Sequence, residues 1–96
     1  MSRIRIEGET TYSKEVIAHG VMNAVKDRLT VIKQDIQELD IDLESFRRKC
    51  ELSDENFLEK FENGELGDDE DFFIWESTIK LKQKLIEEQM VLREAF

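Results

Sequence analysis

The sequence contains no proline, only four glycines and a single cysteine in 96 residues. Because proline breaks helices and glycine weakens them, their scarcity favours long uninterrupted helices. The lone Cys50 cannot form a disulfide within the chain, which suits a reducing compartment. No apolar run approaches the roughly 20 residues of a membrane span, and the first residues lack the apolar core of a signal peptide. We therefore expect one soluble, cytoplasmic domain.

The chain also has little of what catalysis needs. His19 is the only histidine, and it lies on the same predicted helix as Cys50, roughly 46 Å away. A Cys–His nucleophile pair therefore cannot form within one chain, and a zinc site lacks ligands. There is no glycine-rich phosphate loop. These absences predict a protein that is not an enzyme and uses no cofactor.

Positive charge is scarce in the second half of the chain. Residues 1–50 hold nine basic and nine acidic side chains, whereas residues 51–96 hold five basic and fourteen acidic ones, which accounts for the net charge of −9. The negative electrostatic field of this excess of acids repels nucleic acid and anionic membranes, and it favours the binding of cations or of a basic protein surface. Direct nucleic-acid binding is therefore not expected. Solubility alone would also explain the charge.

The strongest helical pattern lies between Ser13 and Cys50. Ser13 suits a helix N-cap, and apolar residues then recur at alternating steps of three and four, as in a coiled coil or helical bundle. The spacing predicts a helix over residues 13–50 with this seam as its core or dimer contact. The seam comprises Met22, Val25, Leu29, Ile32, Ile36, Leu39, Leu43, Phe46 and Cys50.

Two shorter helices are expected next. Ser53 caps a helix over residues 54–62, which Asn63 and Gly64 terminate. Asp68 is expected to cap a third helix over residues 69–95, with Asp71 at the capping-box position. Residues 13–96 thus form an all-α antiparallel helical hairpin built from a long, a short and a C-terminal helix. Residues 1–12 form an N-terminal arm, in which "RIRIE" (3–7) has the alternation of a short strand.

The two long helices differ in length, roughly 57 Å against 40 Å. The uncovered end of the first helix would expose Ile17, Val21, Met22 and Val25, which a soluble monomer does not leave bare. We predict that a second copy covers them in a homodimer, most simply a four-helix bundle or coiled coil. The alternative is a first helix that bends at Gly20 and folds over itself.

The stretch "NGELGDDEDFFIW" (63–75) joins the second and third helices. Turn residues and the preference for negative charge at a helix N-terminus explain much of it. Capping requires one or two acids, however, and this stretch has several more. We therefore interpret it as a candidate surface for a basic protein partner. Its charged contacts are Glu62, Glu65, Asp68, Asp69, Glu70 and Asp71. Phe73 accompanies them, because it points away from the main apolar stripe of the third predicted helix.

A metal site in the same stretch is the competing interpretation. The acids do not follow the spacing of a calcium-binding loop. Glu59/Glu62 and Glu65/Asp68 match the E-x-x-E and E-x-x-D spacings with which all-α pyrophosphatases hold magnesium, but they lie too close in sequence to face one another. We therefore predict no metal site, and a divalent-metal-dependent all-α hydrolase remains an alternative.

Residues 52–85 resemble a group of small, mostly uncharacterised prokaryotic helical proteins. Their shared pattern is roughly S-x-E-x-F-x-x-x-F-x-x-G-E-L-G-D-D-x-D-x-x-x-W. Such proteins are often antitoxin-like, the small partner of a toxin-type nuclease. The resemblance implies an antitoxin-like inhibitor of a basic partner. Together with the predicted dimer and the missing catalytic residues, it suggests a non-enzymatic dimeric interaction module, and a structural scaffold dimer is the alternative. The matching residues are Ser53, Glu55, Phe57, Phe61, Gly64, Glu65, Leu66, Gly67, Asp68, Asp69, Asp71 and Trp75.

Overall fold

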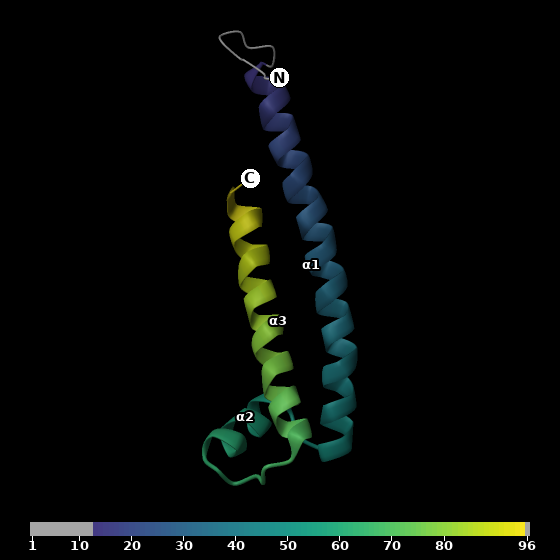
Figure 1. Ribbon diagram of the computed structural model, residues 1–96, viewed down its shortest axis with the longest axis vertical. Coiled ribbons are helices and arrows are strands. Elements are labelled where there is room, and N and C mark those ends of the chain that lie inside the picture. The colour runs from purple at the N-terminus through teal and green to yellow at the C-terminus, as the bar shows by residue number, and fades with distance from the viewer. Residues whose placement is uncertain (1–12, 96) are drawn as a thin grey trace, which may run out of the picture.

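The computed structural model describes residues 13–95 as three helices: α1 (Lys14–Cys50), α2 (Asp54–Glu62) and α3 (Glu70–Ala95). Helices α1 and α3 run antiparallel side by side, and the short α2 packs beside the N-terminal half of α3 (Figure 1). The prediction of an all-α helical hairpin is confirmed. The strand predicted over residues 3–7 lies outside the described residues.

The helix ends follow the local chemistry of the sequence. Ser13 Oγ accepts a hydrogen bond from the backbone N–H of Val16, and Ser53 Oγ accepts one from that of Asn56, at 3.2 and 3.1 Å. Gly64 takes a left-handed conformation with φ of 74° directly after α2. These contacts stabilise backbone groups that would otherwise lack partners at the start of α1 and at both ends of α2.

Helix α3 begins one residue later than the sequence suggested. Asp69 Oδ1 accepts a hydrogen bond from the backbone N–H of Asp71 at 2.9 Å, and the Asp69 carbonyl accepts one from Phe72 at 3.0 Å. Asp69 is therefore the cap, and the capping box predicted for Asp68 and Asp71 does not form. Several consecutive acids can all serve as caps, so the acid that caps the helix cannot be chosen from residue type alone.

The core lies at the closed end of the hairpin, where all three helices meet. Trp75 from α3 is fully buried between two rings: that of Phe57 from α2, at a centroid distance of 3.9 Å, and that of Phe46 from α1, at 5.6 Å. Leu43 and Ile79 complete the buried cluster. Burial of these large rings supplies much of the apolar stabilisation available to so short a chain.

The apolar seam of α1 faces α3 over most of its length. Ile32 and Leu43 are fully buried, and the seam residues between Val25 and Cys50 are otherwise half-buried. Met22, the first seam residue, is 41% exposed because it lies beyond the end of α3. The seam therefore forms the intramolecular contact of the hairpin.

The N-terminal end of α1 extends past α3 (Figure 1). Helix α1 has 37 residues and α3 has 26, so their lengths differ by roughly 16 Å. Ile17 and Val21 in this overhang are 58% and 46% exposed. Helix α1 runs without interruption through Gly20, so the chain does not adopt the alternative in which the first helix folds over itself.

Gly20 offers a test of this continuous helix. No heavy atom lies within 4 Å of a Cβ built at Gly20, and alanine has the higher helix propensity. Gly20→Ala is expected to raise the free energy of unfolding by about 0.5–1 kcal/mol, measured by urea denaturation. As the control, Gly64→Ala should destabilise by about 1 kcal/mol because φ is positive there. A destabilising Gly20→Ala would show that the helix is interrupted at this point.

Of the three helices that the structure describes, none combines the length and the apolar character needed to cross a membrane.

Candidate functional site

The six acids predicted as a partner surface lie together at the closed end of the hairpin. We call them the acidic turn: Glu62, Glu65, Asp68, Asp69, Glu70 and Asp71. They follow the chain from the last residue of α2, through the connection, into the first turn of α3. Five of them are exposed and Asp71 is half-buried. The structure thus brings the whole predicted set to one end of the molecule.

Three of these acids have structural roles. Asp69 caps α3, as described above. Asp71 forms an ion pair with Lys49 at the end of α1, at 3.3 Å. Glu65 lies 3.6 Å from Lys60 and also accepts a hydrogen bond from the Asn63 side chain. Half of the acidic turn therefore has a function within the fold itself.

The other three acids have no such partner. Within residues 13–95, Glu62, Asp68 and Glu70 make no side-chain hydrogen bond and no ion pair. Helix capping and internal pairing therefore do not explain them. They form an exposed negative field at the closed end, which would attract a cationic surface over about a Debye length, ~10 Å at moderate salt.

Phe73 lies beside the acidic turn on α3 and is half-exposed. Its ring meets that of Phe61 edge to face at a centroid distance of 5.2 Å. The exposure of Phe73 agrees with its predicted position away from the main apolar stripe. Aromatic rings are enriched at protein–protein interfaces, so this ring is a candidate contact beside the acidic turn.

A shallow apolar hollow of about 400 Å³ adjoins Phe73 along α3. Ile74 and Leu81 in this hollow are 46% and 48% exposed. The sequence analysis did not single out these two residues, although their seven-residue spacing places them in line on one side of the helix. We call this surface the α3 hollow; it is lined by Glu70, Phe73, Ile74, Ser77, Thr78 and Leu81.

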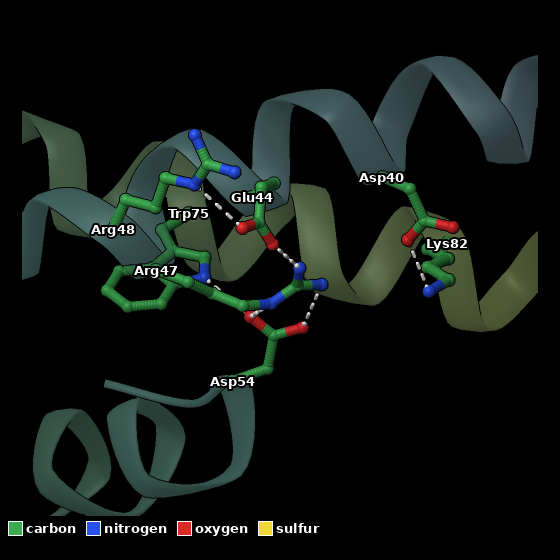
Figure 2. Close-up of polar contacts among 7 residues, drawn as sticks. All are labelled: Asp40, Glu44, Arg47, Arg48, Asp54, Trp75 and Lys82. Atoms are coloured by element: carbon green, nitrogen blue, oxygen red, sulfur yellow. Dashed lines mark hydrogen bonds and ion pairs between the residues drawn. The ribbon is translucent and has the colours of Figure 1, made fainter. Parts of the chain in front are cut away.

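Asp54 fastens α2, and with it the acidic turn, to the hairpin (Figure 2). Its carboxylate accepts a hydrogen bond from Trp75 Nε1 at 3.0 Å and two from the Arg47 guanidinium, from Nε at 3.2 Å and Nη2 at 3.1 Å. One side chain thereby joins all three helices. The sequence analysis treated Asp54 only as part of a short helix, because its partners lie seven residues before and 21 residues after it.

The network continues along α1 through Glu44. Arg48 and Arg47 both donate hydrogen bonds to its carboxylate at 2.9 Å, as Figure 2 shows. These bonds hold the pKa of Glu44 below its usual range, and the bond to Asp54 raises that of Arg47. Arg47, Arg48 and Lys49, the basic residues in the last turn of α1, thus each pair with an acid of the same chain.

The residues considered for catalysis and metal binding do not converge. His19 is exposed in the overhang of α1, whereas Cys50 is half-buried at the other end of the same helix. Over the described range 13–95, no group of three or more His, Cys, Asp and Glu side chains is placed to share a metal ion. The Glu59/Glu62 and Glu65/Asp68 pairs belong to no such group.

Comparison of the chain with protein-family models, curated proteins and solved structures finds no match.

Proposed function

We propose that this protein is a non-enzymatic, dimeric helical interaction module whose acidic turn binds a basic protein partner. The observation that carries the proposal is the set of acids with no partner within residues 13–95, beside the half-exposed Phe73, on an end of the molecule that Asp54 holds fixed. Opposite charge accelerates association with a basic partner, and an aromatic anchor in a desolvated pocket slows dissociation. A preorganised surface also loses little conformational entropy on binding.

The resemblance of residues 52–85 to antitoxin-like proteins suggests the kind of partner. In an inhibitor of a toxin-type nuclease, carboxylates at the acidic turn would occupy the positions of substrate phosphates in the basic cleft. The competing proposal is a scaffold dimer in which the acids serve solubility only. No observation in residues 13–95 favours a divalent-metal hydrolase.

The test is affinity capture from a lysate of the source organism. The variant is the triple substitution Glu62→Gln, Glu65→Gln and Asp68→Asn, because none of these acids supports the fold strongly: two are unpaired and the exposed Glu65–Lys60 pair contributes little. The matched control removes three exposed charges elsewhere: Asp27→Asn, Glu87→Gln and Glu94→Gln. Circular dichroism should show the same helix content for all three proteins.

We expect the wild type and the control to retain the same basic protein, released by salt, and the triple variant to retain at least tenfold less. A tenfold loss corresponds to about 1.4 kcal/mol of binding free energy, which is a small contribution for three charged contacts. Equal capture by wild type and triple variant, or no captured protein at all, would favour the scaffold.

A further inference from the structure

We infer that two copies pack antiparallel across one face of the hairpin, so that the N-terminal end of α1 of each copy covers Ile74 and Leu81 in the α3 hollow of the other. Phe73, which packs against Phe61 of α2, stays outside this contact. The inference rests on the dimeric part of the proposed function and assigns its interface. The occupant of the Ile74–Leu81 side of the α3 hollow is therefore a second copy of this chain.

The face in question is the side of the hairpin that α2 leaves uncovered. Asp35, Glu38 and Leu39 of α1 line a groove of about 200 Å³ together with Leu81 and Leu85 of α3. Leu81 also lines the α3 hollow, so groove and hollow are continuous. On the other side of the hairpin, α2 itself contributes to the groove between α1 and α3. We call the uncovered side the open face.

The overhang of α1 contributes apolar residues to the same open face. Ile17, Ala24 and Val31 stand at seven-residue steps from one another and from Glu38, which lines the groove. Residues seven apart lie on the same side of a helix, so this row faces the same way as the groove. All three are exposed. The open face of α1 is thus apolar in its N-terminal half and acidic around Asp35 and Glu38.

On the open face, the apolar part of α1 and the apolar part of α3 lie at opposite ends of the molecule. The helices run antiparallel, so Ile17 is in the overhang while Ile74 is near the closed end. Phe46 stacks on Trp75, which places Ile74 roughly level with residue 46 or 47 of α1. A monomer cannot bring these two patches together, but an antiparallel partner can.

A two-fold axis near Ile32, the midpoint of α1, aligns the two patches. It brings Ile17 of one copy roughly level with Ile74 of the other, and Ala24 roughly level with Leu81. This register also gives the greatest overlap along the 64 Å length of the molecule. Small Ala24 beside large Leu81 allows the two helices to approach closely.

Charge at the two ends of the dimer favours the same arrangement. In this register Lys14 at the start of α1 lies roughly level with Glu70 at the start of the partner's α3. The helix α1 N-terminus, with its partial positive charge, then approaches the acidic turn of the other copy. A parallel arrangement would instead place the two acidic turns side by side, where like charges repel.

End-to-end pairing of the two overhangs is a poorer solution. It would cover Ile17 and Val21 over about three helical turns and leave Val31, Ile74 and Leu81 exposed. Stable interfaces bury about 1,200–2,000 Å² in total, which so short a contact does not reach. In the antiparallel arrangement, Glu62 and Asp68 stay at the outer ends of the dimer, so each dimer presents two acidic turns.

Disulfide cross-linking tests the arrangement directly. In a Cys50→Ser background, one chain carries Ile17→Cys and a second, differently tagged chain carries Ile74→Cys. On mixing under mild oxidation, we expect a disulfide dimer that contains one chain of each kind, with little dimer from either chain alone. Within one chain the two positions lie at opposite ends of the hairpin, roughly 44 Å apart along the axis, so this bond must join two copies. Ile17→Cys chains that link mainly to one another would overturn the arrangement in favour of end-to-end pairing.

Sedimentation equilibrium provides a second measurement without cysteines. The wild type should sediment at twice the monomer mass of 11.4 kDa at tens of micromolar, and Leu81→Glu should raise the dimer Kd at least tenfold. Ile41→Glu is the matched control, because Ile41 is 71% exposed on the outer side of α1, and it should leave the dimer unchanged. A wild-type monomer would overturn the inference. If the wild type captures no basic protein from the lysate but the 17–74 cross-link forms, only the acidic-turn partner is rejected.

Discussion

Replacing Trp75 by alanine is expected to lower the free energy of unfolding by about 3–5 kcal/mol. The indole is fully buried and lies nearly parallel to the rings of Phe57 and Phe46, with interplanar angles of 10° and 11°. Its removal leaves a cavity where all three helices meet and takes the stacking partner from Phe46, while Phe57 keeps its stack on Phe61. A chain of this size has a total stability of about 5–14 kcal/mol, so the variant should retain only part of it.

Urea denaturation followed by far-ultraviolet circular dichroism measures this effect, since the variant lacks the single tryptophan that fluorescence would need. Two controls separate its causes. Trp75→Phe keeps an aromatic ring in the stack and should cost less than the alanine variant. Phe73→Ala removes a half-exposed ring nearby and should cost about 1 kcal/mol or less. If Trp75→Ala costs no more than Phe73→Ala, the stacked rings are not the core.

The helices themselves follow from local patterns in the sequence. Ser13 and Ser53 act as caps because their side chains reach backbone groups three residues away, a contact that depends on nothing distant. The seam from Val25 to Cys50 predicts which side of α1 is buried for the same reason. It does not say what buries that side, because α3 and a second copy of α1 would cover the same residues.

The contacts of Asp54 could not be read from the sequence in the same way. In the sequence it is one acid among several in the first turn of α2, where any acid is favoured. Its partners Arg47 and Trp75 become neighbours only when α2 folds back over the hairpin. The α3 hollow was missed on similar grounds, since the exposure of Ile74 and Leu81 depends on which side of α3 the short α2 covers.

The acidic turn was found from sequence because its members are close in the chain, so local structure alone brings them together. What the structure adds is a division among them. Asp69 and Asp71 act within the fold, whereas Glu62 and Asp68 have no partner within the described residues. That division makes the binding proposal testable, because the unpaired acids can be changed without removing the cap of α3.

The site and the core are linked through Asp54, so Asp54→Ala should affect both. We expect a loss of about 2–3 kcal/mol in the free energy of unfolding, because the substitution leaves the buried Trp75 N–H without an acceptor and Arg47 without two of its hydrogen bonds. The side chain of Asp54 is only 18% exposed, so water replaces these bonds incompletely. Glu55→Ala is the matched control: it removes an exposed acid from the same helical turn and should change stability by about 0.5 kcal/mol or less.

A double-mutant cycle with Trp75→Phe isolates the hydrogen bond from Trp75 to Asp54. If the bond contributes as the geometry indicates, Asp54→Ala should cost less in the Trp75→Phe background by about 1 kcal/mol, since the donor is already absent. Additive losses would mean that the two side chains act independently and that Arg47 alone holds Asp54. Because α2 precedes the acidic turn directly, hydrogen exchange in residues 54–62 of Asp54→Ala should rise more than exchange in the middle of α1. That pattern would show that this carboxylate holds α2, and with it the acidic turn, in place.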